Sequence, residues 1–117
     1  MTSQAKAAIK KVFLPVPIVV GQTESAEIDL RNVTPIGIFA PADWDSTTIT
    51  FKVAPAYGGT YVVMEDGAGA TYSRTLGASK YIPLDPSLFA GIDAMKIVAG
   101  TTVAGTDSSL TLVVRPV

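Results

Sequence analysis

The chain contains neither cysteine nor histidine among its 117 residues. Without cysteine it can form no disulfide and offers no thiolate ligand to a metal, so its stability must come from packing or assembly. Without histidine it lacks the commonest general base and the commonest metal ligand. The sequence therefore predicts a protein that is not an enzyme and that needs no cofactor or metal.

Charge is also scarce. Charged residues make up 16% of the chain and the net charge is −1, against a usual charged fraction of about 25%. No basic patch dominates, which argues against a nucleic acid partner. The hydrophobic fraction is 48% and the mean hydropathy is +0.38. Two interpretations remain open: a partner covers part of the surface, or this is a small free β domain rich in small residues.

Long hydrophobic runs are missing too. The longest apolar stretch, residues 12–21, is interrupted by Pro15 and Pro17, whereas a membrane-spanning helix needs about 20 apolar residues. No small-residue cleavage site follows this stretch, as a signal peptide would require. We expect a protein that does not enter a membrane and that is made and used without export.

Strand signals fill most of the chain. Residues 26–33, 47–53 and 108–114 alternate polar and apolar side chains, the pattern of half-buried strands. Thr34-Pro35 breaks the first of these segments, and a short apolar strand is expected to resume over residues 36–39. Turn signals such as Asp66-Gly67 separate the segments. The pattern predicts an all-β protein: a single β-sandwich or jelly roll of about eight short antiparallel strands.

One short helical turn is predicted over residues 85–91. Asp85 can cap it, Pro86 suits the first helical position, and Gly91 can end it with a left-handed backbone. Leu88 and Phe89 are then expected to point inward.

The N-terminal part is predicted to stand apart. Residues 1–20 form an extended arm or an edge segment, and residues 21–117 form the sandwich, because Pro15 and Pro17 cannot donate ladder hydrogen bonds. An arm of this kind can order on a neighbouring protein. The predicted partner-binding residues in this segment are Lys10, Lys11, Phe13, Pro15 and Pro17.

Aromatic residues near the turns give the remaining candidates. Trp44, Tyr57 and Tyr72 lie in or beside predicted turns, where they could bury in a protein partner or stack on sugar rings. Asp43, Asp45 and Arg74 would then supply polar contacts to a sugar. The alternative for Trp44 is that it covers an open end of the core. A calcium site built from Asp43, Asp45 and Asp66 is not favoured, since their spacing fits no calcium loop.

The order of these segments resembles a known class of protein. The runs "GIFAPADWDSTTITFKVAPAYGGTYVVMEDGAGATY", "SKYIPLDPSLFAGIDAMKIVAGT" and "LTLVVRPV" are similar to small structural proteins encoded among the head and tail genes of tailed bacteriophages. They also look like the galactose-binding-like jelly roll, although Arg74 is the one arginine in the turns at an obvious ligand position.

The resemblance implies a non-enzymatic virion protein, foremost a capsid decoration protein. Its expected partners are the major capsid protein, other virion proteins and its own copies in a homo-oligomer. Its expected place is the virion, which assembles in the host cytoplasm. A neck or tail component and a carbohydrate-binding β-sandwich module are the alternatives.

Overall fold

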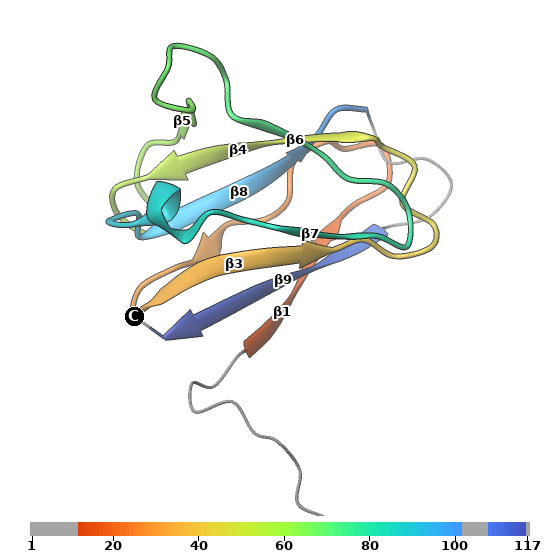
Figure 1. Cartoon of the computed structure of the whole chain (residues 1–117), viewed down its shortest axis with the longest axis horizontal. Helices are drawn as coiled ribbons and strands as arrows, with labels where there is room; N and C mark the ends of the chain where they lie inside the picture. The colour runs from red at the N-terminus through yellow and green to blue at the C-terminus, as the bar shows by residue number, and fades with distance from the viewer. Residues whose placement is uncertain (1–11, 102–107, 117) are drawn as a thin grey trace, which may run out of the picture.

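The computed structural model describes residues 12–101 and 108–116, which form two antiparallel sheets stacked as a sandwich (Figure 1). The four-stranded sheet has the order β1-β9-β3-β7, and the five-stranded sheet has the order β2-β8-β4-β5 with β6 also paired to β4. The predicted all-β sandwich is confirmed. The strands are β1 Val12–Ile18, β2 Ile28–Asp29, β3 Val33–Phe39, β4 Thr48–Ala54, β5 Val62–Val63, β6 Ser73–Thr75, β7 Tyr81–Pro83, β8 Ala94–Ala99 and β9 Ser108–Pro116.

The core lies between the sheets and is built by the predicted alternation. In β4 the side chains of Ile49 and Phe51 are fully buried, and in β9 Leu110 and Leu112 are fully buried. Successive side chains of a strand point to opposite faces. The other face of each sheet is therefore left for solvent or for a partner.

The strand predicted over residues 26–33 is shorter than expected. Ile28–Asp29 form β2 and pair with β8, whereas Val33 already belongs to the next strand, β3. The Asp29 carboxylate accepts a hydrogen bond from the backbone N–H of Arg31 at 2.9 Å, and Asn32 has a left-handed φ of 67°. This local turn competes with the ladder, so the chain bends before β3 in spite of its alternating pattern.

The break predicted at Thr34-Pro35 is wrong, because β3 runs continuously from Val33 to Phe39. The ladder between β3 and β9 shifts register between Pro35 and Gly37. A bulge of this kind accommodates one extra residue, here Ile36, without ending the strand.

Of the two predictions for residues 12–20, the structure favours the edge strand. Residues Val12–Ile18 form β1 and pair with β9 at the border of the four-stranded sheet. Val16 and Ile18 are buried in the core, so this part of the predicted arm is a strand of the sandwich. Residues 1–11, with Lys10 and Lys11, lie outside the described residues.

The predicted helical turn is present as η1, a 3₁₀ helix over Pro86–Phe89. The Asp85 carboxylate accepts from the backbone N–H of Ser87 at 3.0 Å, and Gly91 has a φ of 81°. Phe89 is buried. Within residues 12–101 and 108–116, no helix is long and apolar enough to cross a membrane.

Candidate interaction surface

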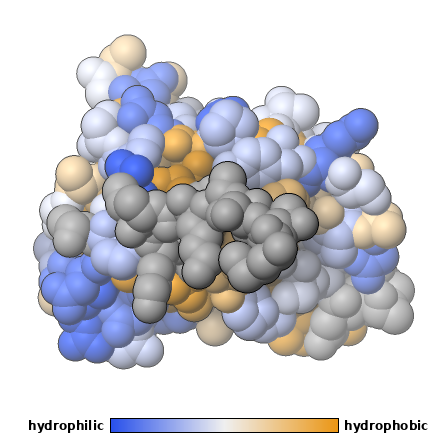
Figure 2. Space-filling model, turned by 60° about the horizontal axis from the view of Figure 1, so that its bottom comes forward, coloured by the Kyte–Doolittle hydropathy of each residue, from blue (hydrophilic) through white to orange (hydrophobic). Residues whose placement is uncertain are grey.

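The two sheets differ sharply in charge. The strands of the four-stranded sheet carry a single charged residue in the described chain, Arg115 near the end of β9. In the five-stranded sheet, β2, β4, β6 and β8 each carry one. Hydrophobic residues come to the surface on the side of the four-stranded sheet (Figure 2). The outer face of the four-stranded sheet therefore stands out by its low charge and its exposed hydrophobic residues.

A row of residues crosses the outer face of the four-stranded sheet. Phe13 of β1 lies opposite Val113 of β9, Val113 lies opposite Gly37 of β3, and Gly37 lies opposite Pro83 of β7. The middle of this row holds only a valine and a glycine. A hollow is left there, with Phe13 standing beside it.

Gly37 sits directly under the ring of Tyr81. A Cβ atom at position 37 would lie 2.0 Å from the Tyr81 hydroxyl oxygen, so any side chain there would push the ring away. Tyr81 lies against Phe39, with 4.5 Å between ring centroids, and its hydroxyl donates to the Ile36 carbonyl at 3.5 Å. The missing side chain at Gly37 thus lets Tyr81 lean across β3.

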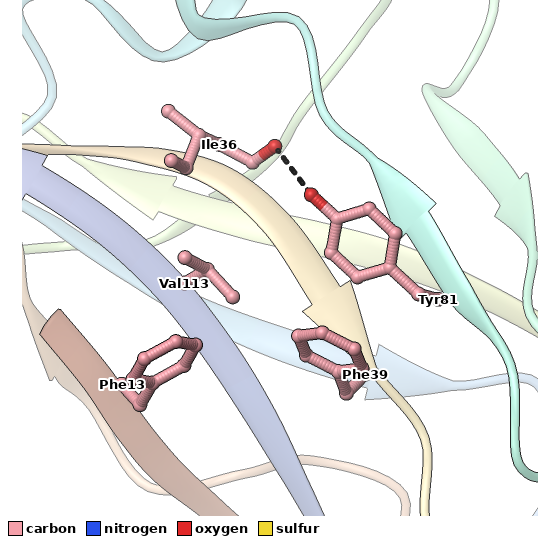
Figure 3. Close-up of a pocket in the computed structure, with 5 residues that line it drawn as sticks. All are labelled: Phe13, Ile36, Phe39, Tyr81 and Val113. Atoms are coloured by element: carbon pink, nitrogen blue, oxygen red, sulfur yellow. Dashed lines mark hydrogen bonds between the residues drawn. The ribbon is translucent and has the colours of Figure 1, made fainter. Parts of the chain in front are cut away.

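These features form a groove of about 290 Å³ (Figure 3), which we call the aromatic groove. Its rings are half exposed: Phe13 is 60% exposed, and Phe39 and Tyr81 are each 44% exposed. No lining side chain is charged, and the one polar side-chain group is the Tyr81 hydroxyl, which donates to the Ile36 carbonyl. The groove is suited to an apolar or aromatic side chain. Its lining residues are Phe13, Ile36, Phe39, Tyr81 and Val113.

The outer face of β1 brings three predicted site residues together. Val16 and Ile18 point into the core, so Phe13, Pro15 and Pro17, at alternate positions, share the opposite face and are exposed. Sequence reasoning missed Phe39 and Tyr81, which complete the groove from β3 and β7.

The three predicted turn aromatics have different environments. Trp44 is only 3% exposed, and its indole N–H donates to the Leu76 carbonyl at 2.9 Å. Tyr72 is half-buried, with its ring stacked on Phe51 at 5.5 Å. Tyr57 is exposed on a turn, under the guanidinium of Arg31. This burial argues against Trp44 as a ligand-stacking residue and supports the interpretation that it covers the core.

Two of the polar residues assigned to sugar binding hydrogen-bond within the fold. Asp43 accepts a hydrogen bond from the Ser108 hydroxyl at 3.2 Å. Arg74 donates to the Pro83 carbonyl at 2.7 Å and to the Tyr72 hydroxyl at 3.4 Å. Asp45 is exposed in the same loop as Trp44. In the described ranges no group of three or more carboxylates is placed to hold a metal.

The five-stranded sheet carries a network of opposite charges on its outer side. Glu24 forms ion pairs with Lys52 and with Lys96, the latter at 3.7 Å. The hydrogen bond from Lys52 is the main cause that lowers the pKa of Glu24 below its ordinary value. The charges of Lys52 in β4 and Lys96 in β8 are thus paired with Glu24 on this sheet.

Glu27 and Asp29 extend the network toward the turn that follows β4. The Glu27 carboxylate accepts from the Tyr61 hydroxyl and from the Gly58 N–H, and these bonds lower its pKa. Two hydrogen bonds from the Arg31 side chain, at 2.9 and 2.7 Å, lower the pKa of Asp29 to about 2. Glu27 thereby ties the turn holding Gly58 to the segment before β2.

Acid is expected to destabilise the protein through these three carboxylates. A carboxyl whose folded pKa lies below its unfolded value stabilises the fold above the unfolded pKa and stops doing so as the pH falls through the folded one. The reference values are 4.5 for Glu24 and Glu27 and 3.8 for Asp29, whose folded pKa is about 2. Urea midpoints should therefore fall between about pH 4.5 and about pH 2.

The matched control for this titration is Glu27→Gln, which removes one of the three carboxylates and keeps its shape. The variant should show a shallower acid dependence and faster amide exchange at Gly58, whose N–H donates to Glu27. Midpoints that stay constant from pH 5 to pH 2 in the unaltered chain would contradict the prediction.

Comparison with known proteins identifies a fold but no family. No family model matches the chain, and no curated protein matches it. Among solved structures, the crystal structure of the SPBc2 prophage-derived protein YomS aligns with a TM-score of 0.61 and 13% sequence identity, over 97% of this chain and 99% of that one. At this identity the likeness shows that the two chains share a fold over nearly their whole lengths.

A second solved structure is too dissimilar to inform the fold. It is the cryo-EM structure of the extra small virus (XSV) VLP of the giant freshwater prawn Macrobrachium rosenbergii. Its TM-score is 0.25 at 14% identity, over 97% of this chain and 82% of that one.

Proposed function

We propose that this chain is a non-enzymatic structural protein of a tailed-phage virion, a capsid decoration protein that binds the major capsid protein and its own copies. The observation that carries the proposal is the outer face of the four-stranded sheet, whose strands hold one charged residue in the described chain. An exposed apolar face with half-exposed rings is typical of a contact surface. The fold supports it, because the similar protein YomS is prophage-derived.

The function is adhesion. Contacts spread over many copies on a particle surface can each be weak and still hold together, because each bound copy raises the effective concentration for the next contact. Such a protein needs a rigid body and an apolar patch, and it needs no reactive group. The paired charges on the five-stranded sheet keep its other side hydrated.

The direct test is to locate the chain in particles. Phage particles would be purified from the strain that encodes the chain, and an antibody against it would be used for immunogold electron microscopy. Regularly spaced label over the head is expected. Label confined to the neck or tail would replace the decoration role by the alternative virion role. Particles without the protein, by label and by mass spectrometry, would overturn the proposal.

A deletion series examines the role of the N-terminal segment in this function. Deleting residues 1–20 would remove β1 together with buried Val16 and Ile18, so loss of binding would report unfolding. Deleting residues 1–11 removes Lys10 and Lys11 and leaves β1 intact. If this segment contributes to adhesion, the shorter deletion should lower occupancy on purified particles. Undiminished occupancy would exclude a role for Lys10 and Lys11.

The carbohydrate-binding alternative receives no support from the positions of its residues. Trp44 and Tyr72 pack against core residues, and Tyr57 lies exposed on a turn beneath the Arg31 guanidinium. A glycan array with the unaltered chain would test it directly, and binding that Tyr57→Ala abolishes would favour it.

A further inference from the structure

The edges of the four-stranded sheet are closed to a further strand. β1 pairs with β9 without a register shift, and alternate residues of an antiparallel strand turn their N–H groups to the same side. Proline has no N–H, so Pro15 and Pro17 belong on the side away from β9. Two of the donors that an added strand would need are therefore missing from the open edge of β1.

The opposite edge, β7, is closed by other means. Pro83 has no N–H, and its carbonyl already accepts a hydrogen bond from Arg74 at 2.7 Å. Blocked edges are a common protection against strand addition. Association through this sheet must therefore use side chains on its outer face.

The outer face has the shape and chemistry to receive its own protruding ring. A pocket of about 150 Å³ lined by apolar side chains can hold a benzene ring, and the aromatic groove offers about 290 Å³. Phe13, 60% exposed, stands at the rim of that groove on the edge strand (Figure 3). In a two-fold pairing, any contact made by one copy is repeated by the other.

Charge also favours an identical partner over one of opposite sign. Two copies of a charged face repel each other, and like-charge contacts are costly. In the described chain the strands of the face carry one charged residue, Arg115, close to the end of β9, so these strands bring little like charge together when two copies meet. The same lack of charge gives a strongly acidic or basic partner nothing to recognise.

We infer that the outer face of the four-stranded sheet pairs with the same face of a second copy about a two-fold axis. Phe13 of each copy enters the aromatic groove of the other, between Phe13 and Phe39 and over Val113. The charged sides of the two five-stranded sheets then face outward from the pair. This inference rests on the proposed function, since it names the copy-to-copy contact of a virion protein.

The available area indicates a weak pair. Four strands spaced about 4.8 Å apart, with about seven residues at about 3.3 Å each, give a face of about 450 Å². Two such faces bury about 900 Å², close to the lower limit of about 1,000 Å² for a specific interface. We expect a dissociation constant of about 10 µM or weaker, which the high local concentration on a particle compensates.

Sedimentation velocity on the purified full chain, from about 1 µM to about 1 mM, tests the pairing. A monomer–dimer equilibrium is expected. Phe13→Ala should weaken it at least about tenfold, because aromatic anchors dominate interfaces. Tyr57→Ala is the matched control, an exposed aromatic outside the groove, and should leave it unchanged. Unfolding curves would verify that both variants fold. A chain that stays monomeric, or a Phe13→Ala variant that dimerises normally, would overturn the inference.

The chain has no cysteine, so single cysteines can report the geometry. Phe13→Cys and Phe39→Cys variants, mixed with oxidised glutathione, should form a disulfide-linked 13–39 heterodimer, while Tyr57→Cys should not link to either. Absence of the 13–39 link in a chain that dimerises would overturn the pairing of these faces. Occupancy on particles separates failure of the pairing from failure of the proposed function. A monomeric chain whose Phe13→Ala variant loses occupancy on particles would overturn the pairing and leave the proposed function standing. A chain that forms the dimer but is absent from particles would overturn the proposed function and leave the pairing of the two faces standing.

Discussion

Replacing Trp44 by alanine is expected to lower the free energy of unfolding by about 3–5 kcal/mol. The indole is 3% exposed and belongs to the core between the sheets. Its N–H donates to the carbonyl of Leu76, a fully buried residue. The substitution therefore opens a cavity and leaves that carbonyl without its donor. Urea unfolding followed by circular dichroism measures the loss, since the chain has no other tryptophan to report by fluorescence.

Two further variants are compared with Trp44→Ala: one at the same position, and one at an exposed aromatic residue. Trp44→Phe keeps most of the ring and removes the N–H, so it should cost about 1–3 kcal/mol. Tyr57→Ala removes an exposed aromatic whose ring lies 5.1 Å from the Arg31 guanidinium and should cost about 1 kcal/mol or less. Equal losses for alanine at positions 44 and 57 would contradict the burial. A stable Trp44→Ala chain that lost a glycan ligand would revive the carbohydrate interpretation.

The strands that alternate over a buried face were predictable from the sequence. Residues 47–53 and 108–114 bury Ile49, Phe51, Leu110 and Leu112 on one side, because a half-buried strand imposes a period of two. The short β2 was not predictable by the same rule. Its alternation continues through residues where Asp29 and Asn32 favour a turn, and local side-chain hydrogen bonds decided the outcome.

The candidate surface was predictable only in part. Pro15 and Pro17 indicated an edge strand correctly. Phe13 was predicted as a partner-binding residue because it lies in the same segment. The groove itself depends on β1, β9, β3 and β7 lying side by side, which brings Phe13 near Tyr81 across 68 positions of sequence. No local pattern encodes that strand order. One signal was available at Gly37, since a glycine inside an apolar strand marks the close approach of a neighbour.

Two of the turn aromatics that were predicted as binding residues are buried or half-buried in the structure. Trp44 and Tyr72 stand among polar and turn-forming residues, where sequence alone leaves both exposure and burial open. Their burial depends on Leu76, Phe51 and Phe89, partners distant along the chain. The candidate surface lies instead on strands whose outward residues in the described chain, such as Pro15 and Gly37, carry no charge apart from Arg115.

Replacing Phe51 by alanine is expected to cost about 3–5 kcal/mol, a large share of the 5–15 kcal/mol typical of a domain. Phe51 is fully buried in β4 and joins two other rings. Tyr72 stacks on it at 5.5 Å, and Phe89 of η1 meets it edge-on at 5.5 Å with an interplanar angle of 81°. Such pairs add about 0.5–1.5 kcal/mol beyond area burial. Urea unfolding at neutral pH measures the loss.

The matched comparison is Phe39→Ala, which removes the same side chain from the outer face of the other sheet. Phe39 is 44% exposed and contacts Tyr81, so its loss should cost about 1 kcal/mol in the monomer. Phe51→Leu should cost about 1.5 kcal/mol or less, because it keeps most of the apolar volume. If Phe39→Ala proved as destabilising as Phe51→Ala, the aromatic groove would be part of the core rather than a free surface. A small loss of stability in Phe39→Ala means that the fold does not need this ring. The exposed ring is then free to contact a partner.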